Sequence, residues 1–432
     1  MEMPRDRRAA RRVGKNAAAR LAAQLGSRLL SLVLVALVAR YEGATGLGRY
    51  ALIVTTLGIV GAAADLGLNM YLTRAVARLD DRQRERDALS GVLPIKLALS
   101  LAATLLVWGA ALAGPWPEPT RQALWMGSLL LLPDQIQGGL RAFVNGRQRM
   151  EISALVDVCV RALGLAGSLA ALAGGWGVSG VLGVAAGASA IGVLMYGGAL
   201  WRWGDLAALR LATADWRAIL GASYPFALTG IIAVAYSRVG LLLLGAWQGE
   251  AAAGWYSAAY KLWEAVGLLP GNLLEALFPE LARLGASEGG AHRLRRLFRT
   301  GAWAMLAAGL ALALGGIALA GLLVRLVYGA GPDDAPTVLL FRVLICAAPA
   351  LFVYLLAGHT LYALERQRRV TMAMLAVGLL SLGVNALAIP RWGQVGAAGA
   401  AALSEWALAG LLVAQARRAL RASTGGAADE QG

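Results

Sequence analysis

Charged and metal-binding side chains are scarce in this sequence of 432 residues. Asp, Glu, Lys and Arg together make up 15% of it, against about a quarter in soluble domains, and hydrophobic residues make up 58%. A soluble fold with so few charges could not cover its surface, so the chain must expose apolar surface to a lipid bilayer. Only two Cys and two His are present, which excludes a disulfide framework and a multi-His metal centre. We expect neither a metal nor a cofactor.

The sequence motifs of common nucleotide- and metal-dependent enzymes are missing as well. There is no GxxxxGK[ST] phosphate loop and no HExxH zinc motif, and the one GxSxG match, at 285–289, has no strand before it. The longest polar segments, near 201–217 and 280–298, are too short for a folded catalytic domain. We therefore expect a protein that is not an enzyme.

Long apolar stretches fill most of the chain. A membrane-spanning helix needs about 20 mostly apolar residues. Twelve stretches satisfy this requirement: 17–39, 48–72, 91–113, 121–144, 151–173, 178–200, 218–245, 253–279, 299–325, 336–363, 370–390 and 394–416. The sequence therefore predicts an all-α polytopic membrane protein. We divide it into a basic tail (1–16), an N-terminal six-helix bundle (17–200), a linker (201–217), a C-terminal six-helix bundle (218–416) and a second tail (417–432).

The distribution of Lys and Arg predicts the orientation of these spans. If the N-terminus is cytoplasmic, the segments on that side carry 28 Lys and Arg residues and the segments on the other side carry 5. The positive-inside rule then places both termini in the cytoplasm. The net charge of +15 is interpreted as this topology signal together with contact to anionic lipid headgroups. We expect no nucleic-acid partner, because no basic domain interleaved with aromatic residues is present.

The two halves of the chain resemble each other. Gly48-Arg49-Tyr50-Ala51 near the start of the second stretch matches Gly254-Trp255-Tyr256-Ser257 near the start of the eighth, 206 residues later. Each match follows a short Gly- and Ala-rich segment, 43–47 or 249–253, which we interpret as an outer loop. Because each half has an even number of spans, the halves enter the membrane from the same side, as parallel repeats do.

Basic residues inside the first span of each half are candidates for ligand binding. Arg28 lies near the middle of the first span, one turn after Gln24, and Arg238 lies in the seventh. With the offset of 206, Arg238 corresponds to Leu32, one helical turn from Arg28. A guanidinium stays charged and forks onto phosphate oxygens, so two of them facing a cavity would suit a phosphate or pyrophosphate. The alternative is a structural ion pair or a side chain that snorkels to an interface.

Three further basic residues extend this set of candidates. Lys261 and Glu264 lie three apart on one helix face, where they either neutralise each other or line a cavity together. Lys96, near the cytoplasmic end of the third span, and Arg342, near the outer end of the tenth, are weaker candidates because both can snorkel.

Carboxylates within the spans are candidates for ion or proton coupling. They are Asp65, Asp134, Glu264 and Glu405. Asp134 and Glu405 have no partner nearby in the sequence, and a desolvated carboxylate can load and release a proton. Asp157, by contrast, has Arg161 four residues later, which predicts an internal ion pair.

Several of these residues belong to motifs that resemble a known family. The motifs are Gly14-Lys15-Asn16, Ser27-Arg28, Gly48-Arg49-Tyr50, Asp65-Leu66-Gly67-Leu68, Gly254-Trp255-Tyr256-Ser257-Ala258-Ala259-Tyr260-Lys261-Leu262 and Phe278-Pro279-Glu280-Leu281. Over roughly residues 14–415 the chain resembles the polysaccharide biosynthesis/oligosaccharide (O-antigen-type) flippase family of the multidrug/oligosaccharidyl-lipid/polysaccharide exporter superfamily.

The resemblance implies a fold, an activity and partners. The fold would be two six-helix bundles around a V-shaped, cationic cavity, which agrees with Arg28, Arg238 and Lys261. The activity would be transfer of an undecaprenyl-pyrophosphate-linked oligosaccharide across the bacterial inner membrane, for lipopolysaccharide or exopolysaccharide synthesis. The implied partners are this lipid-linked substrate and membrane lipids, with a polysaccharide polymerase and glycosyltransferases as further candidates.

Three alternatives stay open. A lipid II flippase is the closest, although such relatives often carry two more helices. A cation-coupled multidrug exporter of the same fold would be expected to have an acidic cavity, and the basic residues within the spans argue against it. A membrane assembly subunit without transport activity would have little reason to hold unpaired charges at mid-span.

Overall fold

The computed structural model describes residues 4–79, 81–205, 216–287, 290–329, 331 and 334–429, with side chains except at 4–25, 225–237, 286, 291 and 423–429. Every regular element within these ranges is an α-helix. The helices are α1 (Pro4–Asp65), α2 (Leu68–Val76), α3 (Arg82–Ala113), α4 (Glu118–Ser128), α5 (Leu131–Gly146), α6 (Met150–Ala173), α7 (Gly177–Arg202), α8 (Trp216–Val266), α9 (Leu268–Ala286), α10 (Gly290–Tyr328), α11 (Asp334–Ile345), α12 (Ala348–Ala363) and α13 (Gln367–Asp429).

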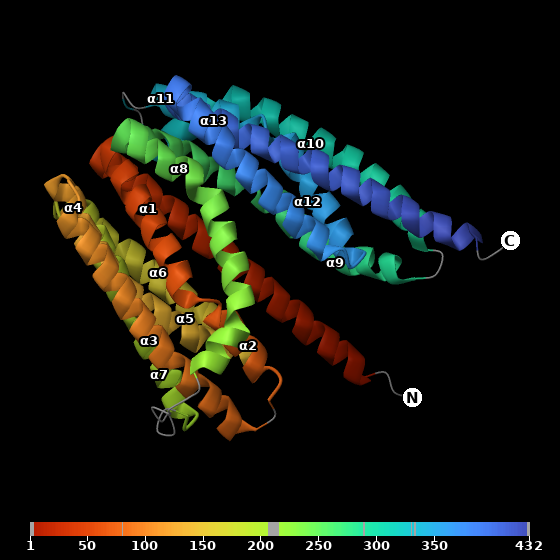
Figure 1. Ribbon diagram of the computed structural model, residues 1–432, viewed down its shortest axis with the longest axis horizontal. Helices are drawn as coiled ribbons and strands as arrows, with labels where there is room; N and C mark the ends of the chain where they lie inside the picture. Colours follow the sequence, from red (N-terminus) through yellow and green to blue (C-terminus); the bar gives the residue numbers. More distant parts are fainter. Residues whose placement is uncertain are drawn as a thin grey trace. The chain divides into compact units, whose positions relative to one another are not determined.

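The helices form two compact units, Met1–Ala235 and Tyr236–Gly432. In the first unit α6 packs on α1 and α7, and α5 packs on α2, α3 and α7. In the second unit α12 contacts α9, α10 and α13, while α11 packs on α10 and α13 (Figure 1). The division falls inside α8, beyond the linker expected at 201–217, of which residues 206–215 lie outside the described part.

Three of the helices contain a sharp kink at a glycine. Gly43 in α1 (φ 65°, ψ −168°) and Gly249 in α8 (φ 83°, ψ −177°) share one conformation, which is essentially restricted to glycine. Gly393 makes a similar kink in α13. The segments 43–47 and 249–253, expected to be loops, are therefore single-residue kinks followed directly by helix. One residue without a Cβ suffices to bend the chain between two helical segments.

Four of the predicted stretches are broken in the middle. The breaks lie at Leu66–Gly67, Leu129–Leu130, Gly267 and Cys346–Ala347. In the last three cases a proline follows within three residues, as Pro133, Pro270 and Pro349. Proline lacks the N–H that would continue the hydrogen bonding and is tolerated best in the first turn of a helix, so each of these three favours a new start for the second segment.

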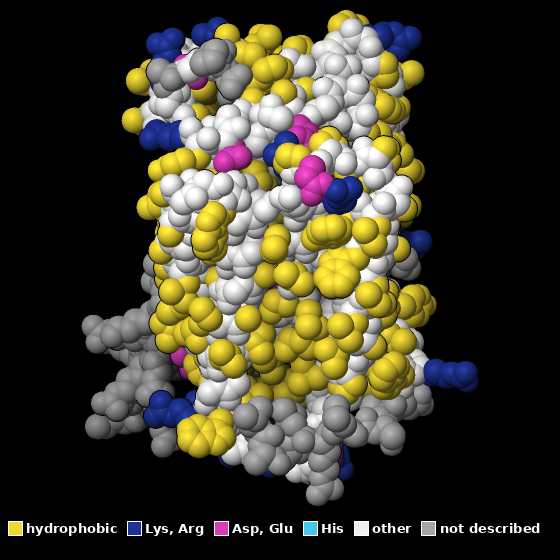
Figure 2. Space-filling model, turned by 90° about the vertical axis from the view of Figure 1, so that its left-hand side faces the viewer, with side chains coloured by type: hydrophobic (Ala, Val, Ile, Leu, Met, Phe, Trp, Pro, Cys, Tyr) yellow, Lys and Arg dark blue, Asp and Glu magenta, His cyan; other side chains and the backbone are white. Residues whose placement is uncertain are grey.

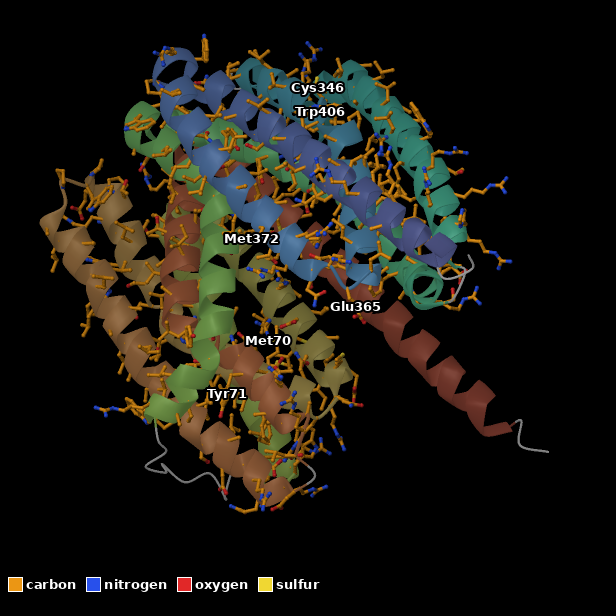
Figure 3. The ribbon with its side chains drawn as sticks, turned by 45° about the vertical axis from the view of Figure 1, so that its right-hand side comes forward. Met70, Tyr71, Cys346, Glu365, Met372 and Trp406 are labelled. Atoms are coloured by element: carbon orange, nitrogen blue, oxygen red, sulfur yellow. The ribbon has the colours of Figure 1, made fainter. Side chains whose placement is uncertain are left out.

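The internal repeat extends to backbone hydrogen bonds. Gln148 and Glu365, 217 residues apart, are non-glycine residues with positive φ, 57° and 56°. Glu365 is labelled in Figure 3. The N–H of Gln148 donates to the carbonyl of Asn145 (2.9 Å), and the N–H of Glu365 donates to that of Tyr362 (3.0 Å). These turns connect α5 to α6 and α12 to α13, so the two halves share a connection as well as the match at offset 206.

The surface is apolar over long lengths of helix. Large side chains such as Leu194, Leu379 and Trp176 are 73%, 72% and 70% exposed. Within the described residues, six helices are long and apolar enough to span a membrane, or seven when the pair α11–α12, bent by 41°, is taken as one span. Two of the six, Gly26–Asp65 and Gln367–Ala422, contain a glycine kink and each cover two of the predicted stretches. Apolar side chains cover the middle of the face in Figure 2. The chain is a multi-pass membrane protein.

Candidate functional site

A buried polar cluster lies in the first unit, at the break between α1 and α2. Lys96 of α3 is completely buried, and its Nζ lies 2.5 Å from Asp65 Oδ1 and 2.9 Å from Gln135 Oε1. The amide of Gln135 in turn donates to the carbonyl of Gly61 (2.9 Å). Lys96 therefore does not snorkel to an interface, because a carboxylate and an amide on neighbouring helices satisfy its charge inside the unit.

A second charged cluster lies in the second unit and is much more open. Arg238 Nη2 lies 3.2 Å from Glu264 Oε1, and Lys261 Nζ lies 3.0 Å from Glu264 Oε2. The exposed fractions of these side chains are 39% for Arg238, 26% for Lys261 and 33% for Glu264. The ion pair between Lys261 and Glu264, one of the two alternatives predicted, is confirmed. Two cations share one carboxylate, so the cluster keeps a positive charge and presents it at an accessible surface.

Aromatic and acidic side chains border this second cluster. Tyr256 and Tyr260, one turn apart on α8, stack with ring centroids 5.6 Å apart and lie within electrostatic range of Arg238 and Glu264. Glu405 of α13, next to Trp406 (labelled in Figure 3), is close enough to both tyrosines for an electrostatic interaction. Its Oε2 is buried and has no hydrogen-bond partner among the described residues. Tyrosine hydroxyls and a solvent-accessible guanidinium can donate hydrogen bonds to phosphate and sugar oxygens.

The structure places the remaining candidates in separate surroundings. Arg28 is exposed on α1, with no carboxylate within 4.0 Å among the described residues. Arg342 donates to the carbonyl of Ile317 on α10 (3.3 Å). Asp134 is exposed in the first turn of α5. The side chain of Gln24 lies outside the described residues.

The internal ion pair predicted for Asp157 has a different partner. Asp157 Oδ1 accepts from Arg141 Nη1 on α5 at 3.4 Å, and not from Arg161, which lies four residues later on the same helix. The spacing of four residues allows a pair but does not require one. A partner on the neighbouring helix competes for the carboxylate, and sequence spacing carries no sign of it.

Sequence reasoning missed one charged network altogether. Asp205, just after α7, is 1% exposed and accepts hydrogen bonds from Arg86 Nε (2.7 Å) and from Arg147, which also bonds to Glu85 Oε2 (2.7 Å). Burial disfavours ionisation of Asp205, but the hydrogen bonds from Arg147 and Arg86 outweigh it and lower its pKa. The network ties together the ends of α3, α5 and α7. Only the occurrence of acidic residues in segments rich in arginine could have suggested it.

Solved structures with the same fold are transporters. A lipid II flippase MurJ in an inward closed conformation has a TM-score of 0.76 at 14% identity, over 91% of this chain and 86% of that one. An inward-facing multidrug resistance MATE family transporter of the MOP superfamily has a TM-score of 0.74 at 14% identity, over 92% and 95%. A MOP superfamily transporter from Pyrococcus furiosus has a TM-score of 0.58 at 15% identity, over 93% and 96%. The chain thus has the fold of the MOP superfamily.

Two family models match the sequence and identify the family of this chain more closely than the fold does. The model described as polysaccharide biosynthesis protein matches residues 13–284, and the model of the lipid II flippase MurJ matches residues 155–428. The chain belongs to the polysaccharide biosynthesis protein family, which confirms the family resemblance drawn from the sequence motifs. It is a transporter-family protein and not an enzyme. No curated protein matches it in sequence.

Proposed function

We propose that this protein moves an undecaprenyl-pyrophosphate-linked oligosaccharide, a polysaccharide repeat unit, across the bacterial inner membrane by alternating access. Twelve spans in two six-helix bundles, with both termini in the cytoplasm, would be the framework. Family membership supports a role in polysaccharide synthesis. The observation that carries the proposal is the half-exposed cluster of Arg238 and Lys261 around the single carboxylate of Glu264.

The chemistry of this cluster fits a pyrophosphate better than a cationic drug. Arg238 and Lys261 together outweigh Glu264 by one positive charge, and all three side chains are reachable by a ligand. A pyrophosphate would replace the carboxylate as the partner of the guanidinium through bidentate hydrogen bonds. Such a site is needed because an unpaired polar headgroup in hydrocarbon costs several kcal/mol for each unsatisfied group. An organic cation would instead meet like charge.

Arg28 and the intramembrane carboxylates have secondary roles in this proposal. Exposed Arg28 would contact the same class of anion from the first unit, with Lys96 and Arg342 holding their helices in place. Glu405, with its unpartnered buried oxygen, is the strongest candidate for proton coupling, ahead of Asp134. Asp65 is occupied by Lys96, which favours a structural role for it.

The test is made in cells of the source bacterium that lack the gene. Lipid-linked glycans are radiolabelled, extracted and assigned to a leaflet by their accessibility, after complementation with wild type, Arg28→Ala, Arg238→Gln or the matched control Arg84→Ala. Arg84 is an exposed arginine whose nearest carboxylate, Asp81, lies 3.9 Å away. We expect glycan-lipid to accumulate on the cytoplasmic side and to be cleared by wild type and by the control only. Unchanged lipid pools after deletion would contradict the proposal.

The lipid II flippase is a second candidate, favoured by the family-model match over residues 155–428. Its substrate would share the undecaprenyl pyrophosphate and would differ in the sugar. Expression of this chain in a bacterium depleted of its own lipid II flippase separates the two. Restored growth would support the lipid II assignment, whereas growth arrest with restored polysaccharide export in the deletion strain would support the oligosaccharide assignment.

A further inference from the structure

An arginine-lined groove lies at one end of the second unit, away from the Arg238 cluster in the sequence. Its volume is about 710 Å³, and it is formed by the first turns of α10, the last turns of α13 and Val353 of α12. Its basic lining residues are His292, Arg293, Arg295, Arg296, Arg299, Arg417 and Arg421. No Asp or Glu among the described residues lines it.

The groove is amphipathic along the helix axis. His292, Arg296, Arg299 and Trp303 follow one another at helical spacing and so lie along one face of α10. The next lining residue on α10 is Leu306, and Val353 and Val413 continue the apolar side from α12 and α13. Beyond the arginines, α10 becomes the most hydrophobic of the candidate spans, with a mean hydropathy of 2.3 over its most apolar 18 residues. The groove therefore changes from cationic to apolar where the helix enters the membrane.

Five arginines of the groove lack a charged partner within the described part of the chain. Arg293, Arg295, Arg296, Arg299 and Arg417 have no carboxylate within 4.0 Å there and no hydrogen bond to a side chain. Four of them lie in the first turns of α10, at the positive end of its helix dipole, which makes their accumulation still less favourable without a counter-ion.

A nearby arginine shows what a compensated charge looks like in this unit. Arg283 of α9 lies 2.8 Å from Glu280, three residues earlier on the same helix, and its Nε also donates to that carboxylate at 3.0 Å. The helix segment at the groove has no such acidic residue, because α10 contains no Asp or Glu at all. On α9 the guanidinium of Arg283 is paired with a carboxylate of the same helix, whereas the arginines of α10 at the groove have no carboxylate on their own helix.

We infer that this groove binds an anionic phospholipid, with its phosphate between the arginines of α10 and α13 and an acyl chain along Trp303, Leu306 and Val413. Guanidinium groups bind phosphate oxygens bidentately, which accounts for arginine on both walls. The apolar side of the groove would hold the acyl chain of a phospholipid, which a free phosphate does not have. The cytoplasmic leaflet is rich in such phosphate esters at the depth where juxtamembrane arginines lie. This site is separate from the Arg238 cluster and does not depend on the proposed transport activity.

Native mass spectrometry of the purified full-length protein in detergent tests this inference. Phosphatidylglycerol and phosphatidylcholine with identical acyl chains are titrated into wild type and into the groove variant Arg296→Gln/Arg299→Gln/Arg417→Gln. The matched control is Arg366→Gln/Arg368→Gln/Arg369→Gln, which removes the same charge from the residue before α13 and from the first turn of α13. Because each arginine near a lipid surface contributes about 1 kcal/mol, we expect wild type and control to bind phosphatidylglycerol at least about tenfold more tightly than phosphatidylcholine. The groove variant should lose this preference.

Further arms separate the sources of the phosphate. Competition by inorganic phosphate or glycerol 3-phosphate at equal concentration would overturn the inference, because it would show a site for a free anion. Displacement of the lipid mole for mole by undecaprenyl pyrophosphate would also overturn it, because the groove would then serve the transported substrate. Equal binding by wild type and the groove variant would be equally contradictory. A single Arg299→Gln variant with an unchanged thermal midpoint, expected to lose about fivefold in affinity, guards against a folding defect in the triple variant.

Discussion

The two units each place a carboxylate just before a helix break and surround it differently. In the first unit Asp65 precedes the Leu66–Gly67 break and binds Lys96, which is completely buried. In the second unit Glu264 precedes the break at Gly267 and binds both Arg238 and Lys261, with a quarter to two fifths of each cationic side chain exposed. In the first cluster Gln135 provides a further buried partner for Lys96, whereas the second cluster is open to solvent.

This difference separates a charge that holds the fold from a charge that is available to a ligand. Removing one partner of a buried pair leaves an uncompensated charge away from water, which is strongly destabilising. Removing one partner of an exposed pair costs little, because water solvates the other. Charged clusters beside helix breaks in the two units can therefore differ in role because they differ in burial and in the number of cations, and the following changes test that difference.

The largest expected effect is on stability, at Lys96. Lys96→Met should lower the free energy of unfolding by about 3 kcal/mol, because Asp65 and Gln135 lose their common donor inside the unit. Lys261→Met, the matched change in the open cluster, should cost less than about 1 kcal/mol. Unfolding by sodium dodecyl sulfate in mixed micelles measures both. Equal losses would contradict the distinction between the two clusters.

A smaller effect is expected at the network that joins the ends of α3, α5 and α7. Asp205→Asn should lower the free energy of unfolding by about 2 kcal/mol, because it weakens charge-assisted hydrogen bonds from Arg147 and Arg86. The pKa of Asp205 is lowered in the folded state, so its contribution is full above the ordinary carboxyl pKa of 3.8 and is lost as the pH falls through the lowered folded value. The stability difference between wild type and Asp205→Asn should therefore shrink only in strong acid. A difference that shrinks near neutral pH would rule out this assignment.

A third prediction concerns the kinks that the two units share. Gly43→Ala and Gly249→Ala should each cost about 1–2 kcal/mol, because the Cβ is strained at φ 65° and 83° with ψ near 180°. Gly271→Ala, at a helical glycine where a Cβ would meet no atom within 4 Å, is the control and should be neutral or slightly stabilising. Thermal midpoints of the three variants and wild type in detergent measure these losses of stability. A loss at only one of the two kinks would mean that the repeat does not preserve their conformation.

Much of the fold could be predicted from hydropathy and spacing. Apart from the four breaks, the twelve apolar stretches are helical where the structure describes them, since a bilayer demands long runs with internally satisfied backbone groups. The match between Gly48 and Gly254 located the kinks at Gly43 and Gly249 by the same offset, although a glycine turn and a short loop look alike in sequence. The helix breaks could be expected only where a proline marks them.

The candidate site was less predictable because ion pairs form between helices. The Lys261–Glu264 pair follows from helical spacing, whereas Arg238 reaches Glu264 from 26 residues away. Lys96 and Asp65 each were visible as intramembrane charges, but nothing in the sequence says that they neutralise each other. Asp157 shows the converse, since a favourable spacing to Arg161 loses to Arg141 on another helix.

We propose that the open cluster of Arg238 and Lys261 binds a pyrophosphate, whereas the closed cluster around Lys96 only stabilises the fold. The most direct measurement is the affinity of purified protein for undecaprenyl pyrophosphate, for wild type, Arg238→Gln and the control Arg84→Ala. Loss of a hydrogen bond to a charged group predicts about tenfold weaker binding for Arg238→Gln, with an unchanged thermal midpoint. Wild-type affinity in Arg238→Gln, with the protein folded, would show that Arg238 does not bind the pyrophosphate.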